Sequence, residues 1–157
     1  MEKAINLEAL KPSEIVNVHM DENRILQVSF NYPILDSDVD YKVACYLKKQ
    51  KEKFEKERGK CLGAYVDITK YHLLDSVSLF GITLPSPKVR KLHGDMHKAS
   101  PQFKRVAIRR KDTSRLAEVC VKMATIYHHK EVKLFSDHQK AISWLVEGIK
   151  LLPKTKA

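Results

Sequence analysis

The sequence predicts an α/β domain built on a mixed β-sheet. Segments in which apolar and polar residues alternate, as in strands, are interleaved with segments whose apolar residues recur every three or four positions, as in helices. The resulting order is β-β-α-β-α-β-α-β-α. No internal repeat or long linker divides the 157 residues, a length typical of one domain. We therefore expect a single domain over residues 1–157 with its core at about 14–151.

The first two strands are expected to form a β-hairpin. Residues 14–20 and 24–30 alternate between apolar and polar side chains, and Asp21-Glu22-Asn23 separates them as a turn. Pro33 then interrupts the ladder because proline donates no backbone hydrogen bond. Strands joined by a short turn are antiparallel, whereas those joined through helices are parallel with right-handed connections.

The first long helix is expected to begin at Asp36 or Ser37, either of which can cap it, and to end at Gly59. Its apolar stripe consists of Val39, Val43, Tyr46, Leu47 and Phe54. The charged run at 48–58 is interpreted as a solvated helix end.

The rest of the chain continues the alternation of strands and helices. The nearly continuous apolar run at 60–68 is typical of a strand covered on both faces. The following elements are expected to be a helix at 86–98, a strand at 103–109, a helix at 113–128, a strand at 131–135 and a last helix that opens with a capping box at 136–139 and ends at Pro153.

Cysteine usage and hydropathy indicate a cytoplasmic protein. Cys45, Cys61 and Cys120 are odd in number and lie among apolar neighbours, which favours buried, reduced thiols over disulfides. The first residues lack the apolar stretch of a signal peptide, and no run reaches the roughly 18–20 apolar residues of a membrane span.

Most of the net charge of +10 comes from residues 88–111, which contain nine basic residues and one acidic residue, Asp95. This segment is a candidate anion-binding patch for an acidic protein surface, lipid headgroups or nucleic acid. The alternative is the solvated face of a helix followed by a strand end. Nucleic acid is the least favoured partner, because only Phe103 could stack on a base. The patch comprises Lys88, Arg90, Lys91, Lys98, Lys104, Arg105, Arg109, Arg110 and Lys111.

No catalytic signature is present in the sequence. The five glycines are scattered and form no phosphate-binding loop, and there is no nucleophile-elbow motif. His93 and His97 are spaced to share a helix face, but no third metal ligand can be identified. We therefore expect no catalytic residue, no metal and no cofactor.

Two segments resemble the STAS domain superfamily, in its SpoIIAA-like (anti-sigma-factor-antagonist-like) branch. One is residues 134–145, Leu-Phe-Ser-Asp-His-Gln-Lys-Ala-Ile-Ser-Trp-Leu, which follows the strand at 105–108; the other is the strand-loop-helix segment at 66–79. The resemblance implies the same element order and a role in binding partner proteins. In the family, an Asp-Ser-Ser-Gly motif carries a regulatory phosphoserine.

That motif is only partly matched in this chain. Asp75 and Ser76 fit, but the phosphorylated serine corresponds to Val77, which has no hydroxyl, and Ser78 replaces the glycine. Asp75, Ser76 and Ser78 therefore form a candidate switch loop, and the usual serine phosphoswitch is not expected. Capping of a helix by Asp75 or Ser76 is the simpler interpretation.

The favoured function is a non-catalytic regulatory or protein-interaction module with a protein partner. The first alternative is a protein that binds a lipid or small molecule, because SpoIIAA-like domains resemble the core of CRAL-TRIO lipid carriers and the apolar residues at 73–84 could line a pocket. Weak nucleic-acid binding through the basic segment is a further alternative. Homodimer formation is left open.

Overall fold

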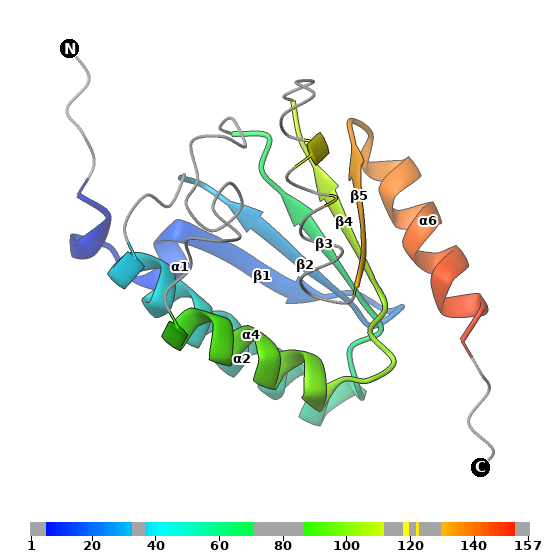
Figure 1. Cartoon of the computed structure of the whole chain (residues 1–157), viewed down its shortest axis with the longest axis horizontal. Helices are drawn as coiled ribbons and strands as arrows, with labels where there is room; N and C mark the ends of the chain where they lie inside the picture. The colour runs from blue at the N-terminus through cyan, green and yellow to red at the C-terminus, as the bar shows by residue number, and fades with distance from the viewer. Residues whose placement is uncertain are drawn as a thin grey trace.

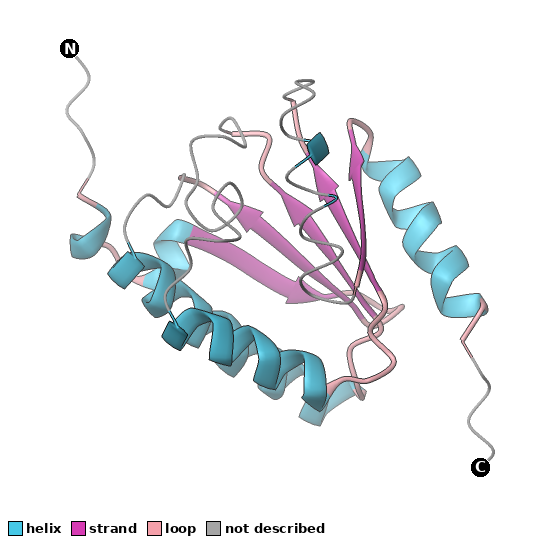
Figure 2. Cartoon of the chain, viewed as in Figure 1, coloured by secondary structure: helices cyan, strands magenta, loops and turns pink. Residues whose placement is uncertain are grey.

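Five strands form one mixed sheet in which the spatial order follows the sequence order (Figure 2). The computed structural model describes residues 6–32, 37–70, 87–111, 118–119, 122 and 130–152. β1 is antiparallel to β2, and the other neighbouring pairs are parallel. The predicted hairpin and parallel crossovers are confirmed. The strands are β1 (Val16–Met20), β2 (Ile25–Phe30), β3 (Gly63–Asp67), β4 (Arg105–Arg109) and β5 (Glu131–Phe135).

Helices lie on both faces of this sheet (Figure 1). On one face, α2 (Ser37–Arg58) packs with α4 (Pro87–Ala99) beside it. On the other, α6 (His138–Lys150) packs on β3, β4 and β5. Two short helices, η1 (Leu7–Ala9) and α1 (Pro12–Ile15), precede β1.

Alternation along the strands divides the core in two. Leu26, Val28 and Phe30 belong to the cluster that includes Val39 and Val43 of α2. On the opposite face, Ile25, Tyr65 and Ala107 pack with Ala141 and Leu145 of α6. Covering β3 from both sides explains why its sequence is almost entirely apolar.

Several element boundaries differ from the predictions. Glu14 and Ile15 lie in α1 rather than in a strand, because Pro12 occupies the first helical position and the Glu14 carboxylate accepts the Lys11 amide at 2.6 Å. The third and fourth strands begin at Gly63 and Arg105, later than expected.

The cap of α6 also differs from the prediction. The Asp137 carboxylate, not the Ser136 hydroxyl, accepts the amides of Gln139 and Lys140, at 2.7 and 3.2 Å. Within the predicted helix at 113–128, the structure describes residues 118, 119 and 122, and these are helical.

The cysteine prediction is confirmed for Cys61, whose side chain is fully buried and whose thiol donates to the Gly63 carbonyl at 3.1 Å. Burial raises the pKa of this thiol, so it stays protonated. Cys45 is half-buried, and Cys120 lies outside the described residues.

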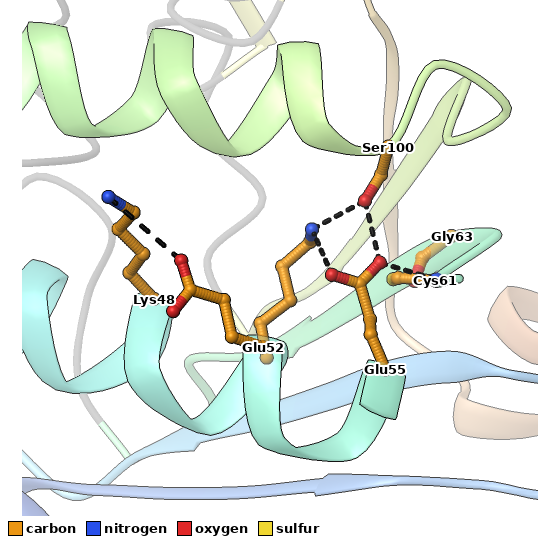
Figure 3. Close-up of polar contacts among 7 residues, drawn as sticks. Lys48, Glu52, Glu55, Cys61, Gly63 and Ser100 are labelled. Atoms are coloured by element: carbon orange, nitrogen blue, oxygen red, sulfur yellow. Dashed lines mark hydrogen bonds and ion pairs between the residues drawn. The ribbon is translucent and has the colours of Figure 1, made fainter. Parts of the chain in front are cut away.

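The predicted solvated end of α2 is wrong at two positions, Lys51 and Glu55, whose side chains are only 4% and 6% exposed. The Lys51 ammonium donates to Glu55 at 2.9 Å and to the hydroxyl of Ser100 at 2.5 Å. The other Glu55 oxygen accepts the Ser100 hydroxyl at 2.7 Å and the Cys61 amide at 2.8 Å. Figure 3 shows these contacts, which we call the buried network.

The buried network joins three parts of the chain. Glu55 lies in the last turn of α2, Ser100 directly follows α4, and Cys61 lies just before β3. Burial alone would raise the pKa of Glu55, but hydrogen bonds from the Cys61 amide, Lys51 and Ser100 outweigh it and lower the pKa. Glu55 is therefore held as a carboxylate.

Further contacts pin the same end of the sheet, where the parallel strands begin. Lys130, just before β5, is 7% exposed and donates to the Phe103 carbonyl just before β4. Burial lowers the pKa of Lys130, and the nearby charges of Lys104 and Lys51 lower it further. Arg58, at the end of α2, donates to the Met20 carbonyl at 2.6 Å.

Lys51→Met should lower the free energy of unfolding by about 3 kcal/mol or more, because it leaves the Glu55 carboxylate buried without its cation. The matched control is Lys48→Met on the same helix. Lys48 pairs with Glu52 at 4.0 Å, and these side chains are 33% and 56% exposed (Figure 3). The Lys48→Met substitution should lower the free energy of unfolding by less than about 1 kcal/mol. Urea denaturation measures both values, and equal losses would contradict the assignment.

Asp40, in the first turns of α2, generates a pH dependence. Asp40 is 4% exposed, and its Oδ2 atom accepts no hydrogen bond from the described part of the chain. Burial raises the pKa of Asp40 to about 6. A raised carboxyl pKa favours the folded state at low pH, and this contribution is lost as pH rises through about 6.

Asp40→Asn should therefore gain stability relative to the native chain as pH rises from about 4 to 7. The shift above the ordinary value sets an upper limit of about 3 kcal/mol on this gain. Unfolding free energies of both chains across that pH range provide the measurement, and their difference removes effects from other groups. A difference independent of pH would show that Asp40 titrates normally.

Candidate functional site

The strand register places two rows of mostly polar side chains across the outer face of the sheet, the face opposite α2. Successive residues point to opposite faces, so residues paired across strands share a face. The first row contains Asn17, Ser29, Asp67, Arg109 and Phe135, and the second contains His19, Gln27, Tyr65, Ala107 and Lys133.

Helix α6 covers only part of this face. It packs on β3, β4 and β5 and reaches Ile25 at the start of β2, but no described helix packs on the rest of the outer face of β1 and β2 (Figure 1). A shallow depression of about 230 Å³ lies there, which we call the outer-face cleft. Its polar lining consists of Asn17, His19, Gln27, Ser29, Tyr65, Asp67 and His138.

Tyr65 forms the buried part of the cleft. The residue is 4% exposed, and its ring meets the His138 ring edge-on, with centroids 4.9 Å apart. Its hydroxyl has no hydrogen-bond partner among the described residues. Burial raises the pKa of Tyr65 and the charge of Asp67 adds to this, while Arg109 opposes it. Tyr65 is thus a protonated phenol near neutral pH, and Asp67 and Arg109 are the charged groups that act on it.

Asp67 ends β3 and connects the cleft to a second depression. Its Oδ1 accepts the Thr69 amide at 2.8 Å and the Thr69 hydroxyl at 2.6 Å, which fixes the turn after the strand. Its Oδ2 lies 3.6 Å from Arg109 Nη1, a weaker contact.

The second depression lies at the carboxyl ends of β3, β4 and β5 and has a volume of about 500 Å³. We call it the sheet-end pocket. The pocket is lined by Thr69, Arg109, Arg110, Lys111, Leu134, Phe135 and Ser136.

The structure separates the nine basic residues of the predicted patch into three places. Lys88, Arg90, Lys91 and Lys98 belong to α4, beside α2. Lys104 and Arg105 lie at the amino end of β4, whereas Arg109, Arg110 and Lys111 lie at its carboxyl end. The five residues of β4 span roughly 16 Å, so the basic residues at its two ends lie at opposite ends of the strand.

Arg105 has a structural role between the sheet and α6. Its guanidinium donates to the Trp144 carbonyl at 2.9 Å, pairs with Glu131 at 3.0 Å and lies 4.7 Å from the centre of the Trp144 ring. Gly148 makes room for it, since a Cβ there would lie 2.5 Å from Arg105 Cδ. The segment at 134–145 that resembles the SpoIIAA-like branch thus includes the contact by which α6 packs on the sheet.

The remaining predicted sites are the candidate switch loop and the apolar residues at 73–84. Asp75, Ser76 and Ser78 and the apolar residues at 73–84 fall outside the described residues. Within the described ranges, no three His, Cys, Asp or Glu side chains gather as a metal site. No helix in those ranges is long and apolar enough to cross a membrane.

Sequence reasoning missed the outer-face cleft. The sequence did contain one signal for this cleft. Tyr65 and Asp67 carry polar groups in an otherwise apolar strand. Because they are two residues apart, their side chains lie on the same face of the sheet. The neighbours Asn17, His19, Gln27 and Ser29 occupy the polar positions of the hairpin. Their convergence depends on the register between β2 and β3, which sequence alone does not reveal.

Tyr65→Phe should leave the free energy of unfolding within about 0.5 kcal/mol of the native value, or raise it slightly, because the lost hydroxyl makes no hydrogen bond with any described residue. Urea denaturation at neutral pH provides the test. A loss of about 1–3 kcal/mol would mean instead that the hydroxyl is paired in the folded chain.

Comparison with solved structures supports the predicted fold. No family model matches the chain, and no curated protein matches it. A solved structure from Shewanella loihica PV-4, an uncharacterized protein of the DUF3478 family with a SpoIIAA-like fold, superposes with a TM-score of 0.52. The two are 21% identical over 83% of this chain and 93% of that one. The likeness, together with the mixed sheet and its helices, shows that this chain has the SpoIIAA-like α/β fold.

Proposed function

We propose that this domain is a non-catalytic regulatory module that binds a partner protein on the outer-face cleft and the adjoining face of β1 and β2. The observation that carries the proposal is the incomplete cover of the sheet. One face is packed by α2, while on the outer side of the hairpin α6 reaches Ile25 and no described helix packs on the rest.

The side chains on this face support binding to a protein. Asn17, His19 and Ser29 present amide, imidazole and hydroxyl groups that can exchange water for a partner's polar groups, while the Gln27 amide already donates to Asp21 at 2.9 Å. Protein interfaces place such polar groups in a rim around a more apolar core that holds few charges, with water bridging the two partners. The Tyr65 hydroxyl adds a donor beside these groups.

The same geometry favours binding over catalysis. Burial raises the pKa of Tyr65, so its phenol is not a base near neutral pH. Asp67 is already engaged by Thr69 and lies near Arg109. The departure at Val77 supports regulation without the usual serine phosphoswitch. Division of the basic residues among three places argues against a nucleic-acid surface.

A photo-cross-linking amino acid at Ser29 should capture one discrete partner in extracts of the source cell. The same group at Lys91, exposed on α4, serves as the matched control and should capture it several-fold less. A further substitution, Asn17→Arg, should reduce capture from Ser29, since it adds a bulky charge to the paired position of the row.

The mass of the adduct identifies the partner class, and a mass of twice the chain would identify a second copy of this protein. Equal capture from Ser29 and Lys91, or no discrete adduct from Ser29, would refute the proposed surface.

A further inference from the structure

The sheet-end pocket is a second candidate site, and its lining residues differ from those of the outer-face cleft. We infer that this pocket binds the phosphate group of a small soluble molecule. Three consecutive cations, Arg109, Arg110 and Lys111, line one depression of about 500 Å³ at the carboxyl ends of β3, β4 and β5. That volume is in the range typical of small-molecule sites.

Two carboxylates lie near these cations. Asp67 lies 3.6 Å from Arg109, and Glu118 lies 3.5 Å from Arg110. Both distances exceed the roughly 2.7–2.9 Å of a strong charge-assisted hydrogen bond. The Glu118 side chain is 58% exposed, whereas that of Arg110 is 12% exposed. A phosphate dianion in the pocket would attract the guanidinium groups more strongly than either carboxylate does.

Neutral groups complete the chemistry. The hydroxyl of Ser136 borders the cations and can donate to a phosphate oxygen, whereas the Thr69 hydroxyl already donates to Asp67. Thr69 is fixed by its two bonds to Asp67, and Ser136 is positioned by Arg109, whose Nε donates to the Ser136 carbonyl at 3.4 Å. Asp137 follows Ser136, but its carboxylate is occupied by the first amides of α6.

The walls of the pocket favour an organic phosphate rather than a polymer. Leu134 and Phe135 supply an apolar surface beside the cations, and Phe135 is backed by Trp144, with ring centroids 5.5 Å apart. A concave site with one cationic end suits a phosphorylated small molecule. A nucleic-acid backbone or a membrane needs cations spread over a broad surface, whereas Lys88 and Lys91 lie on α4 beside α2.

Pyrophosphate titration followed by amide chemical shifts tests this inference, with chloride adjusted to keep ionic strength constant. Saturable shifts are expected at Thr69, Ser136 and residues 109–111, but not along α4. Lys111→Gln should weaken binding several-fold and Arg109→Gln by about tenfold or more, since each removes one charged contact. The matched control Lys91→Gln, also at an exposed lysine, should bind like the native chain.

Equal weakening in Lys91→Gln and Lys111→Gln would overturn the inference, as would shifts on α4 or none at the pocket. Vesicles containing phosphatidic acid provide a second arm: binding to them that excess pyrophosphate fails to displace would assign the cations to a membrane surface instead. Cross-linking from Ser29 is measured in Lys111→Gln as well, so failure of this site and failure of the protein-binding surface are distinguishable.

Discussion

The buried ion pair between Lys51 and Glu55 is the constraint on which the rest of the fold depends. Two charges removed from water are tolerated only when each is paired and its remaining hydrogen-bonding capacity is used. Ser100 and the Cys61 amide meet that requirement, and they come from the end of α4 and the approach to β3. The ion pair can therefore be buried only when α2, α4 and β3 meet at one place.

This arrangement gives the two ends of the sheet different roles. At the amino ends of the parallel strands, Lys51, Arg58 and Lys130 are used in structural contacts. At the carboxyl ends, Arg109 and its neighbours line an open pocket. The fixed start of β3 also sets its register with β2, which places Tyr65 and Asp67 beside the polar positions of the hairpin. Structural and candidate functional polar groups are thus spatially separated.

Periodicity in the sequence was sufficient to predict the five strands, α2, α4 and α6, because each buries an apolar face with a regular repeat. It could not reveal the buried network, since Lys51 and Glu55 have the spacing of an ordinary surface ion pair. Arg105 and Arg109 also look alike in the sequence. What distinguishes them is Gly148, which comes from another element and admits one guanidinium beneath α6.

Native-state hydrogen exchange of the Cys61 amide tests most directly whether the buried network fixes β3. This amide donates to Glu55 at 2.8 Å, so it should exchange only through global unfolding, with the free energy obtained from denaturation. In Glu55→Gln, the amide should open before the core of β3 does. Rapid exchange of Cys61 in the native chain, with β3 fully protected, would contradict the central place given to this interaction.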